Sequence, residues 1–180
     1  MLDHHVEGYL QHGIKINPGD IVFDVGANVG VFGVRVLQKA PDVKVFCFEP
    51  IPEIADALRA NASLHGQGRM VVIEEGVSAS IGQATFTYFP NTPALSTAHP
   101  EQWDQNPGAF KEAVKSTMKN PPESMRWMRW IPTMFSGLIA NYLVKGRHTV
   151  TCKLTTIAEV INTHKLDRID LMKIDCEGAE

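Results

Sequence analysis

Residues 23–33, FDVGANVGVFG, contain an acidic side chain, several glycines and a side-chain amide within one short stretch. An apolar run ends at Asp24, after which Gly26, Asn28 and Gly30 alternate with small apolar residues. Glycines let a ligand approach the backbone, and the N-terminus of a following helix offers unpaired N–H groups. The stretch therefore predicts a strand-to-helix turn that holds a nucleotide-like cofactor.

The turn departs from the dinucleotide fingerprint, G-x-G-x-x-G. It reads G-x-N-x-G, and an acid stands before its first glycine. A carboxylate at Asp24 would sit badly beside a pyrophosphate but suits a positively charged ligand, such as the ammonium and sulfonium of S-adenosylmethionine. Two other interpretations remain open: a nicotinamide-dependent oxidoreductase, and a noncatalytic module that binds an adenosyl cofactor or a partner. Asp24 could also simply cap the turn.

Further polar groups follow other predicted strands. Glu49 ends the second strand, where a carboxylate can accept hydrogen bonds from both ribose hydroxyls. After the third strand, Ser78 and the backbone of Val77 are placed to meet an adenine edge, and Asp175 closes the fourth strand. A strand order of 3-2-1-4 would bring all these groups to one edge of a sheet, where ligands bind in such folds.

The elements that must position these groups alternate along the chain. Short apolar runs with little alternation predict strands buried on both faces, helical spacing predicts helices between them, and Thr156 begins a capping-box pattern. This order predicts an α/β, Rossmann-like, doubly wound sheet. The predicted strands are 20–26, 42–50, 70–75, 84–89 and 169–175, and the predicted helices are 31–39 and 52–66.

Residues 90–147 interrupt this alternation, since they hold most of the prolines and all three tryptophans. A connection this long is typical of a lid or substrate-binding insertion. Its segment MRWMRWIPTMF (125–135), together with Lys111, Lys115 and Lys119, is locally basic. We favour a helical lid that packs Trp127 and Trp130 over an apolar substrate; a docking face for an acidic carrier domain and an RNA contact are the alternatives.

Length and composition limit the number of domains, the partners and the metal sites that we expect. The chain has 180 residues, enough for a single domain, and a net charge of -3, which does not favour nucleic acid as a partner. Cys47, Cys152 and Cys176 indicate reduced thiols, and the seven histidines show no metal-ligand spacing, so no metal site is predicted. No signal peptide or membrane-spanning run is evident, and we expect a soluble, cytoplasmic protein.

Four segments, VFDVGANVGVFG, FCFEPIPE, LTTIAEVI and IDLMKIDCEGAE, resemble the FkbM-type family of S-adenosylmethionine-dependent methyltransferases. The resemblance implies a Rossmann-like methyltransferase fold that usually acts on a hydroxyl oxygen. The YLQHGI lead-in and the long insertion are most similar to members embedded in polyketide and nonribosomal peptide synthases. A small metabolite or a carrier-tethered intermediate of secondary metabolism is then the expected substrate. We expect the cofactor to be held by Asp24, Gly26, Ala27, Asn28, Gly30, Glu49, Pro50, Val77, Ser78 and Asp175.

A hydroxyl acceptor must lose its proton, which calls for a base near the transferred methyl group. Glu177 is our candidate for the base or for a residue that orients the acceptor, with Asp175 closer to the cofactor. Both could instead be solvated acids at a helix start, or ligands of a divalent cation. Nitrogen and carbon acceptors also remain open.

The family continues past EGAE with a helix and further strands, whereas this sequence stops at Glu180. We therefore expect the chain to be truncated, with its C-terminal strands missing. The fourth strand would then be an unprotected sheet edge. On this reading, the chain expressed alone is poorly soluble or binds the cofactor weakly.

Overall fold

A computed structural model of the chain describes residues 8–9, 13–93, 96–98, 107–121, 126 and 130–176. Within them the chain divides into two compact units, one formed by residues up to Thr85 and from Thr151 to Cys176, the other by Phe86–Val150. The insertion predicted at 90–147 lies inside the second unit. Its role as a lid stays a prediction.

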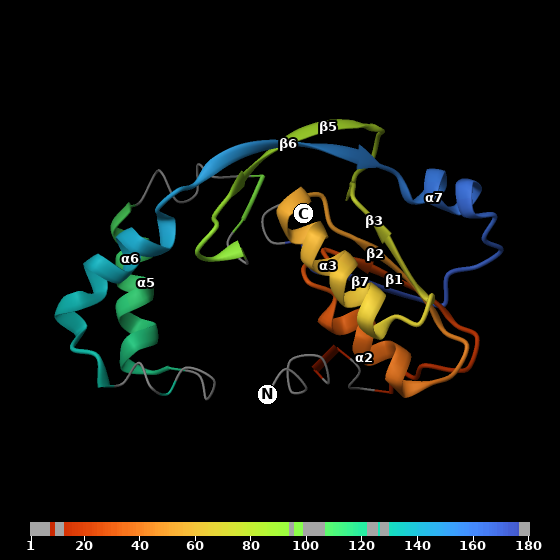
Figure 1. The fold of residues 1–180 in the computed structure, drawn as a ribbon, viewed down its shortest axis with the longest axis horizontal. Helices are drawn as coiled ribbons and strands as arrows, with labels where there is room; N and C mark the ends of the chain where they lie inside the picture. The colour runs from red at the N-terminus through yellow and green to blue at the C-terminus, as the bar shows by residue number, and fades with distance from the viewer. Residues whose placement is uncertain are drawn as a thin grey trace. The chain divides into compact units, whose positions relative to one another are not determined.

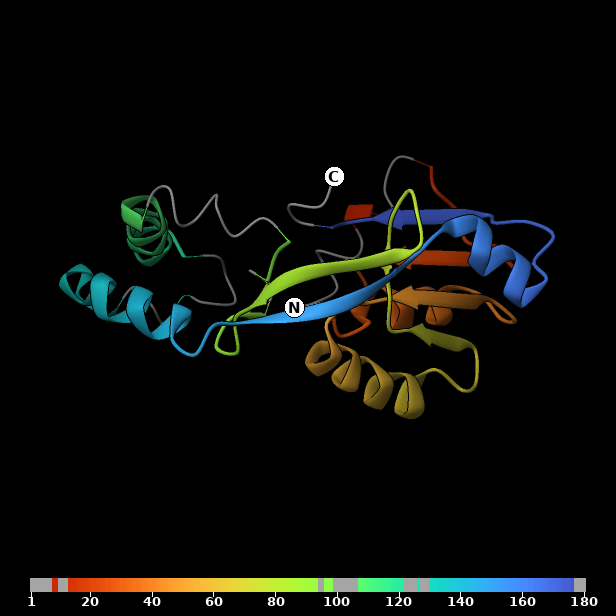
Figure 2. The same ribbon diagram turned by 90° about the horizontal axis from the view of Figure 1, so that it is seen from above.

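The first unit is built on a parallel sheet of four strands in the order β3-β2-β1-β7. Seen from above, the four strands lie in a row with β1 between β2 and β7 (Figure 2). With β7 as the fourth predicted strand, this is the predicted order of 3-2-1-4. The α/β, Rossmann-like fold class is confirmed. The strands are β1 (Ile21–Val25), β2 (Lys44–Phe48), β3 (Met70–Ile73) and β7 (Leu171–Ile174).

Helices cover the two faces of this sheet, because alternate strand residues point to opposite sides. On one face, Val22, Val45 and Cys47 are buried against α2 (Val31–Lys39) and α3 (Pro52–His65) (Figure 1). On the other face, Phe23, Val25, Phe46 and Phe48 pack against α7 (Ile157–His164). The Thr156 side chain caps α7 by accepting a hydrogen bond from the Glu159 N–H at 3.1 Å, as the sequence pattern predicts.

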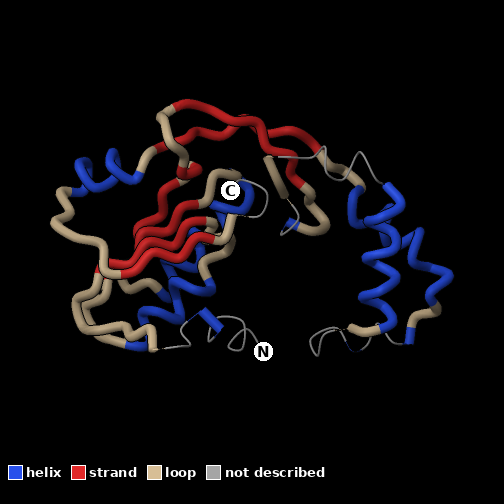
Figure 3. Tube along the Cα trace, turned by 180° about the vertical axis from the view of Figure 1, so that it is seen from behind, coloured by secondary structure: helices blue, strands red, loops and turns tan. Residues whose placement is uncertain are grey.

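A second sheet has the order β4-β6-β5, drawn in red with the first in Figure 3. Its strands are β4 (Gly76–Val77), β5 (Gly82–Tyr88) and β6 (His148–Thr155). The sequence analysis predicted β5 but missed β4 and β6. β4 has only two residues, too short for a pattern to show. β6 does carry a signal, since Val150, Cys152 and Leu154 alternate with polar residues.

The second unit holds the end of β5, the start of β6 and the helices between them. It contains α5 (Pro107–Lys119), the short 3-10 helix η3 (Thr133–Phe135) and α6 (Ser136–Val144). Val114, Met118 and Ala140 form the centre of a separate apolar cluster between α5 and α6. This unit therefore has a core of its own, as expected for an insertion that folds as a subdomain.

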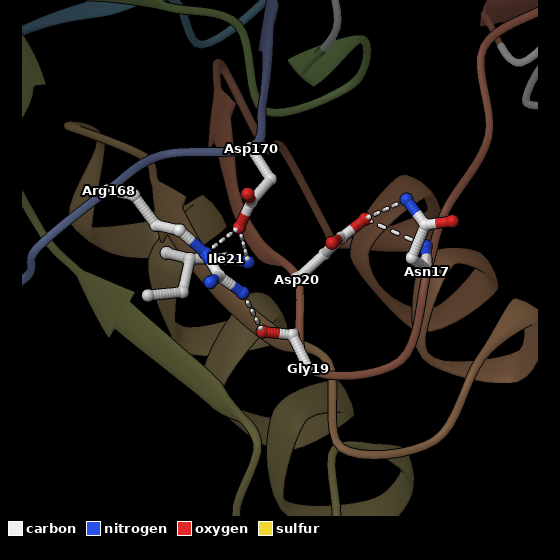
Figure 4. A network of polar contacts seen from close by, with 6 residues as sticks. All are labelled: Asn17, Gly19, Asp20, Ile21, Arg168 and Asp170. Atoms are coloured by element: carbon white, nitrogen blue, oxygen red, sulfur yellow. Dashed lines mark hydrogen bonds and ion pairs between the residues drawn. The ribbon is translucent and has the colours of Figure 1, made fainter.

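A polar network ties β7 to β1 at their amino ends (Figure 4). One carboxylate oxygen of Asp170 accepts hydrogen bonds from the Ile21 N–H at 2.8 Å and from Arg168 Nε at 3.0 Å. Arg168 also donates to the Gly19 carbonyl. The Ile21 amide, followed by Arg168, lowers the pKa of Asp170. The network holds the start of β7, the outer strand that Asp175 follows, against the start of β1.

None of the helices in the described ranges has the length and apolar character required to cross a membrane.

Candidate functional site

Three of the acids predicted to do chemistry, and the glycine turn, lie at one edge of the four-stranded sheet. The strands are parallel, so their carboxyl ends point the same way. Asp24 and Gly26 are at the end of β1, Glu49 follows β2, and Asp175 follows β7. The structure therefore brings three acids and the glycine turn together from three separate segments, at the edge where such sheets bind ligands.

The glycine turn is shaped by packing as well as by any ligand. Gly26 and Gly30 have φ angles of 73° and 84°, a left-handed conformation that favours glycine. A Cβ on Gly26 would collide with the carbonyl oxygen of Asp175, and one on Gly30 would lie 2.5 Å from Leu58 Cδ1. The sequence analysis explained these glycines by the close approach of a ligand. Their lack of a side chain also lets the segment after β7 and helix α3 pack closely on the turn.

The carboxylate of Glu49 forms hydrogen bonds with the turn after β1 and with the turn after β2. Its Oε2 accepts a hydrogen bond from the Asn28 N–H, and its Oε1 accepts one from the Ile51 N–H, both at 3.1 Å. Burial raises the pKa of Glu49 to about 7 despite these two bonds. Asn28 has a positive φ of 50°, and its side-chain oxygen accepts from the Val29 N–H at 2.8 Å. Asn28 therefore shapes the turn itself.

Asp24 is fully buried, and a cation of the chain itself lies beside it. In the parallel register Lys173 of β7 is the direct partner of Asp24, and its Nζ is 3.0 Å from Asp24 Oδ1. Asp24 Oδ2 has no hydrogen-bond partner among the described residues. Burial raises the pKa of Asp24, and the charge of Lys173 opposes that rise. A ligand cation would reach this carboxylate only if Lys173 moved.

Lys173 and Tyr9 are site residues that the sequence analysis did not identify. Lys173 Nζ donates to the Gly26 carbonyl at 3.1 Å and lies 3.6 Å from Asp175 Oδ2. The Tyr9 hydroxyl donates to the same Asp175 oxygen at 2.6 Å. The signal for Lys173 was a lysine inside an apolar strand, LMKI, two residues before the predicted acid. Tyr9 was noticed only as part of the YLQHGI lead-in.

The other predicted cofactor residues lie around this centre. The Ala27 N–H donates to the Phe48 carbonyl at 2.9 Å, and Pro50 lines a cavity beside the sheet. Val77 packs on the α7 face of the sheet, while Ser78 is exposed and its N–H donates to the Thr155 carbonyl. Their contact with an adenine stays a prediction. Glu177 and Trp127 lie outside the described residues.

The cavity that Pro50 lines has a volume of about 590 Å³ and lies within the first unit, between residues of β3, β6 and α7. Three glutamates reach it, Glu74, Glu75 and Glu159, along with Lys153 and His164. Cys152 on its wall is buried, and burial followed by the nearby charge of Glu49 raises its thiol pKa to about 11. The thiol is therefore protonated and unreactive at neutral pH.

Comparison with known proteins identifies the family of this arrangement. The model of the methyltransferase FkbM domain matches residues 24–180. The protein named 31-O-demethyl-FK506 methyltransferase FkbM, from Streptomyces tacrolimicus, is 32% identical over 96% of this chain and 61% of its own. AMB antimetabolite synthetase AmbE of Pseudomonas aeruginosa is 30% identical over 97% of this chain and 8% of its own. The chain thus spans less than two thirds of either relative.

Solved structures show a more limited likeness. Precorrin-6y C5,15-methyltransferase from Geobacter metallireducens superimposes on 39% of this chain and 36% of its own, with 15% identity and a TM-score of 0.34. A superposition of this extent does not bear on activity.

Proposed function

Because the chain belongs to the family of the methyltransferase FkbM domain, we propose that it carries out S-adenosylmethionine-dependent methyl transfer. The acceptor is a hydroxyl oxygen on a small metabolite or on a carrier-tethered polyketide or peptide intermediate. One observation carries the proposal beyond the family: Gly26, Glu49 and Asp175 meet at the carboxyl edge of one parallel sheet.

The residues at this edge fit a cofactor that has a ribose and a positive charge. Each oxygen of Glu49 accepts a single backbone N–H, and each keeps a second lone pair for a ribose hydroxyl. The side chain of Asp175 is 45% exposed and presents a carboxylate to the solvent side of the sheet edge. Asp175 is therefore better placed than the buried Asp24 to meet a ligand's positive charge.

S-Adenosylmethionine, when bound, supplies an electrophilic methyl group on a good leaving group. The work left to the chain is to orient the acceptor and to exclude water. A hydroxyl acceptor also needs a base, the role proposed for Glu177, while Asp175 lies closer to the cofactor. Asp175 is already hydrogen-bonded to Tyr9, which fixes the direction of its carboxylate.

The relatives support the substrate class. The name of the Streptomyces relative refers to an O-demethyl compound, which favours an oxygen acceptor. The match to AmbE covers 8% of a much longer synthetase, which favours a substrate tethered to a carrier domain, in secondary metabolism. The cytoplasmic location predicted from the sequence is part of the same proposal.

Binding and transfer assays test the proposal. We expect calorimetry to show binding of S-adenosylmethionine and S-adenosylhomocysteine, with no competition from NADH. Radiolabelled methyl groups should pass to a hydroxyl-bearing acceptor. E49A should weaken binding, because it removes both acceptors for the ribose, whereas the control E74Q at the end of β3 should not. Displacement by NADH would instead support an oxidoreductase, and binding without methyl transfer would support a noncatalytic module.

A further inference from the structure

Lys173 lies at the centre of the candidate site, with almost no exposure to solvent. Its side chain is 9% exposed, and its Nζ is 3.0 Å from Asp24 Oδ1, 3.1 Å from the Gly26 carbonyl oxygen and 3.6 Å from Asp175 Oδ2. The ammonium also lies over the rings of Tyr9 and Phe32, 5.5 and 5.8 Å from their centres. One cation thus connects β1, the glycine turn and the segment after β7.

The two acids beside Lys173, Asp24 and Asp175, differ in their exposure to solvent and in their other hydrogen-bond partners. Asp24 is fully buried, and one of its oxygens has no hydrogen-bond partner in the described part of the chain. An isolated carboxylate in such a place takes up a proton unless a cation pairs with it. Asp175 is half-exposed and already accepts the Tyr9 hydroxyl. Asp24 therefore depends on Lys173 far more than Asp175 does.

We propose that Lys173 is a positioning residue that stays in place as the internal counter-ion of Asp24 and holds the Gly26 carbonyl, so that Asp175 is the acid that meets the cofactor's positive end. The inference rests on the proposed cofactor. It changes the role that the sequence alone assigned to Asp24, which was expected to face the ligand, whereas Asp175 was already expected to bind the cofactor. A lysine that lies over two aromatic rings and against a fully buried carboxylate cannot give way to a ligand's ammonium without opening the core.

A double-mutant cycle on binding tests this role. K173M should weaken S-adenosylhomocysteine binding by roughly tenfold or more, because removing one partner leaves a buried charge or a loosened turn. K173R should retain most of the affinity. In the D24N background the same change, D24N/K173M, should cost much less, because no buried carboxylate remains. K44M is the matched control, since Lys44 on β2 of the same sheet also lies over an aromatic ring but is exposed.

The opposite results would overturn the proposal. If Lys173 only fills the place of the cofactor's ammonium, K173M should bind S-adenosylhomocysteine as tightly as the wild type or more tightly. An equal loss of affinity in the wild-type and D24N backgrounds would show that the two residues act independently. Should K173M fail to fold, the affinities of D24N/K173M and D24N still test the proposal, which predicts only a small difference between them.

Thermal unfolding against pH gives a second readout that needs no cofactor. Asp24 is faced by Lys173 and Asp175 from β7 and its end, and by Cys47 and Glu49 from β2. Without Lys173 the carboxylate prefers its protonated form, so K173M should lose stability relative to wild type as pH rises, and D24N/K173M should not. If wild type binds neither S-adenosylmethionine nor S-adenosylhomocysteine, the proposed function fails, while this readout still decides whether Lys173 holds Asp24. Parallel pH profiles for K173M and D24N/K173M would refute that pairing.

Discussion

Glu49 illustrates what a single buried acid does at this site. Burial raises its pKa from 4.5 to about 7, so the folded chain holds a proton that the unfolded chain has released. The stability that this proton contributes is complete below pH 4.5 and is lost as pH rises through about 7. We expect wild type to lose up to about 3 kcal/mol of unfolding free energy over this pH range through this group.

The variant E49Q has no ionisable group there, so its unfolding free energy, measured by urea titration, should be flatter over the same pH range. E74Q, which removes a more exposed carboxylate at the end of β3, should keep the wild-type slope. A slope in E49Q as steep as in wild type would mean that another group titrates in this window.

At the scale of residues, the sequence predicted that the acids lie at strand ends, but it did not predict which side chains contact them. Asp24, Glu49 and Asp175 stand at strand ends, which apolar runs reveal. The pairing of Asp24 with Lys173 depends on the register of β1 against β7, and these strands are far apart in the sequence. No local pattern encodes that register. The contacts of Lys173 with the rings of Tyr9 and Phe32 likewise join distant parts of the sequence and follow from no local pattern.

Among the elements, the turn from β1 to α2 makes the most specific demand on its residues. Gly30 has a positive φ, and an added Cβ would also meet Leu58 of α3. G30A should therefore lower the unfolding free energy by about 2–4 kcal/mol, from backbone strain plus overpacking. Gly68 has a similar φ of 74° but nothing within 4 Å of an added Cβ.

G68A is thus the matched control, with an expected cost of about 1–2 kcal/mol from backbone strain alone. Chemical denaturation of both variants measures the difference, which isolates the contact between the turn and α3. Equal costs for the two substitutions would show that Leu58 moves aside freely.

The elements themselves were largely predictable because their patterns are strong. The start of α3 follows from Pro52, and α2 was predicted with its observed bounds. β6 was missed although Val150, Cys152 and Leu154 alternate, because its pattern lies next to an insertion without other strand signals. Its neighbours in the sheet, β4 and β5, come from a different part of the chain, and that pairing together with the alternation identifies β6 as a strand.

At the scale of the whole molecule, the described residues separate into two units with independent apolar clusters. Every residue predicted to bind the cofactor, from Asp24 to Asp175, lies in the first unit. The sequence predicted a single domain with an insertion at 90–147, from the concentration of proline and tryptophan there. It could not specify what the insertion binds, and the 88% exposure of Trp130 in the structure leaves that ligand a prediction.

This division leads to a prediction for a variant in which residues 90–147 are replaced by a short glycine-containing turn between β5 and β6, which belong to one sheet. We expect the dissociation constant for S-adenosylhomocysteine to stay within about threefold of wild type, a change below about 1 kcal/mol. With the insertion acting as the proposed lid, which would orient the acceptor and exclude water, methyl transfer to the acceptor should fall by roughly a hundredfold. A second variant that keeps the insertion but carries W130A tests whether the apolar surface is responsible. Loss of cofactor binding in a well-folded replacement variant would place part of the cofactor site in the second unit, and unchanged methyl transfer would exclude the insertion from acceptor binding.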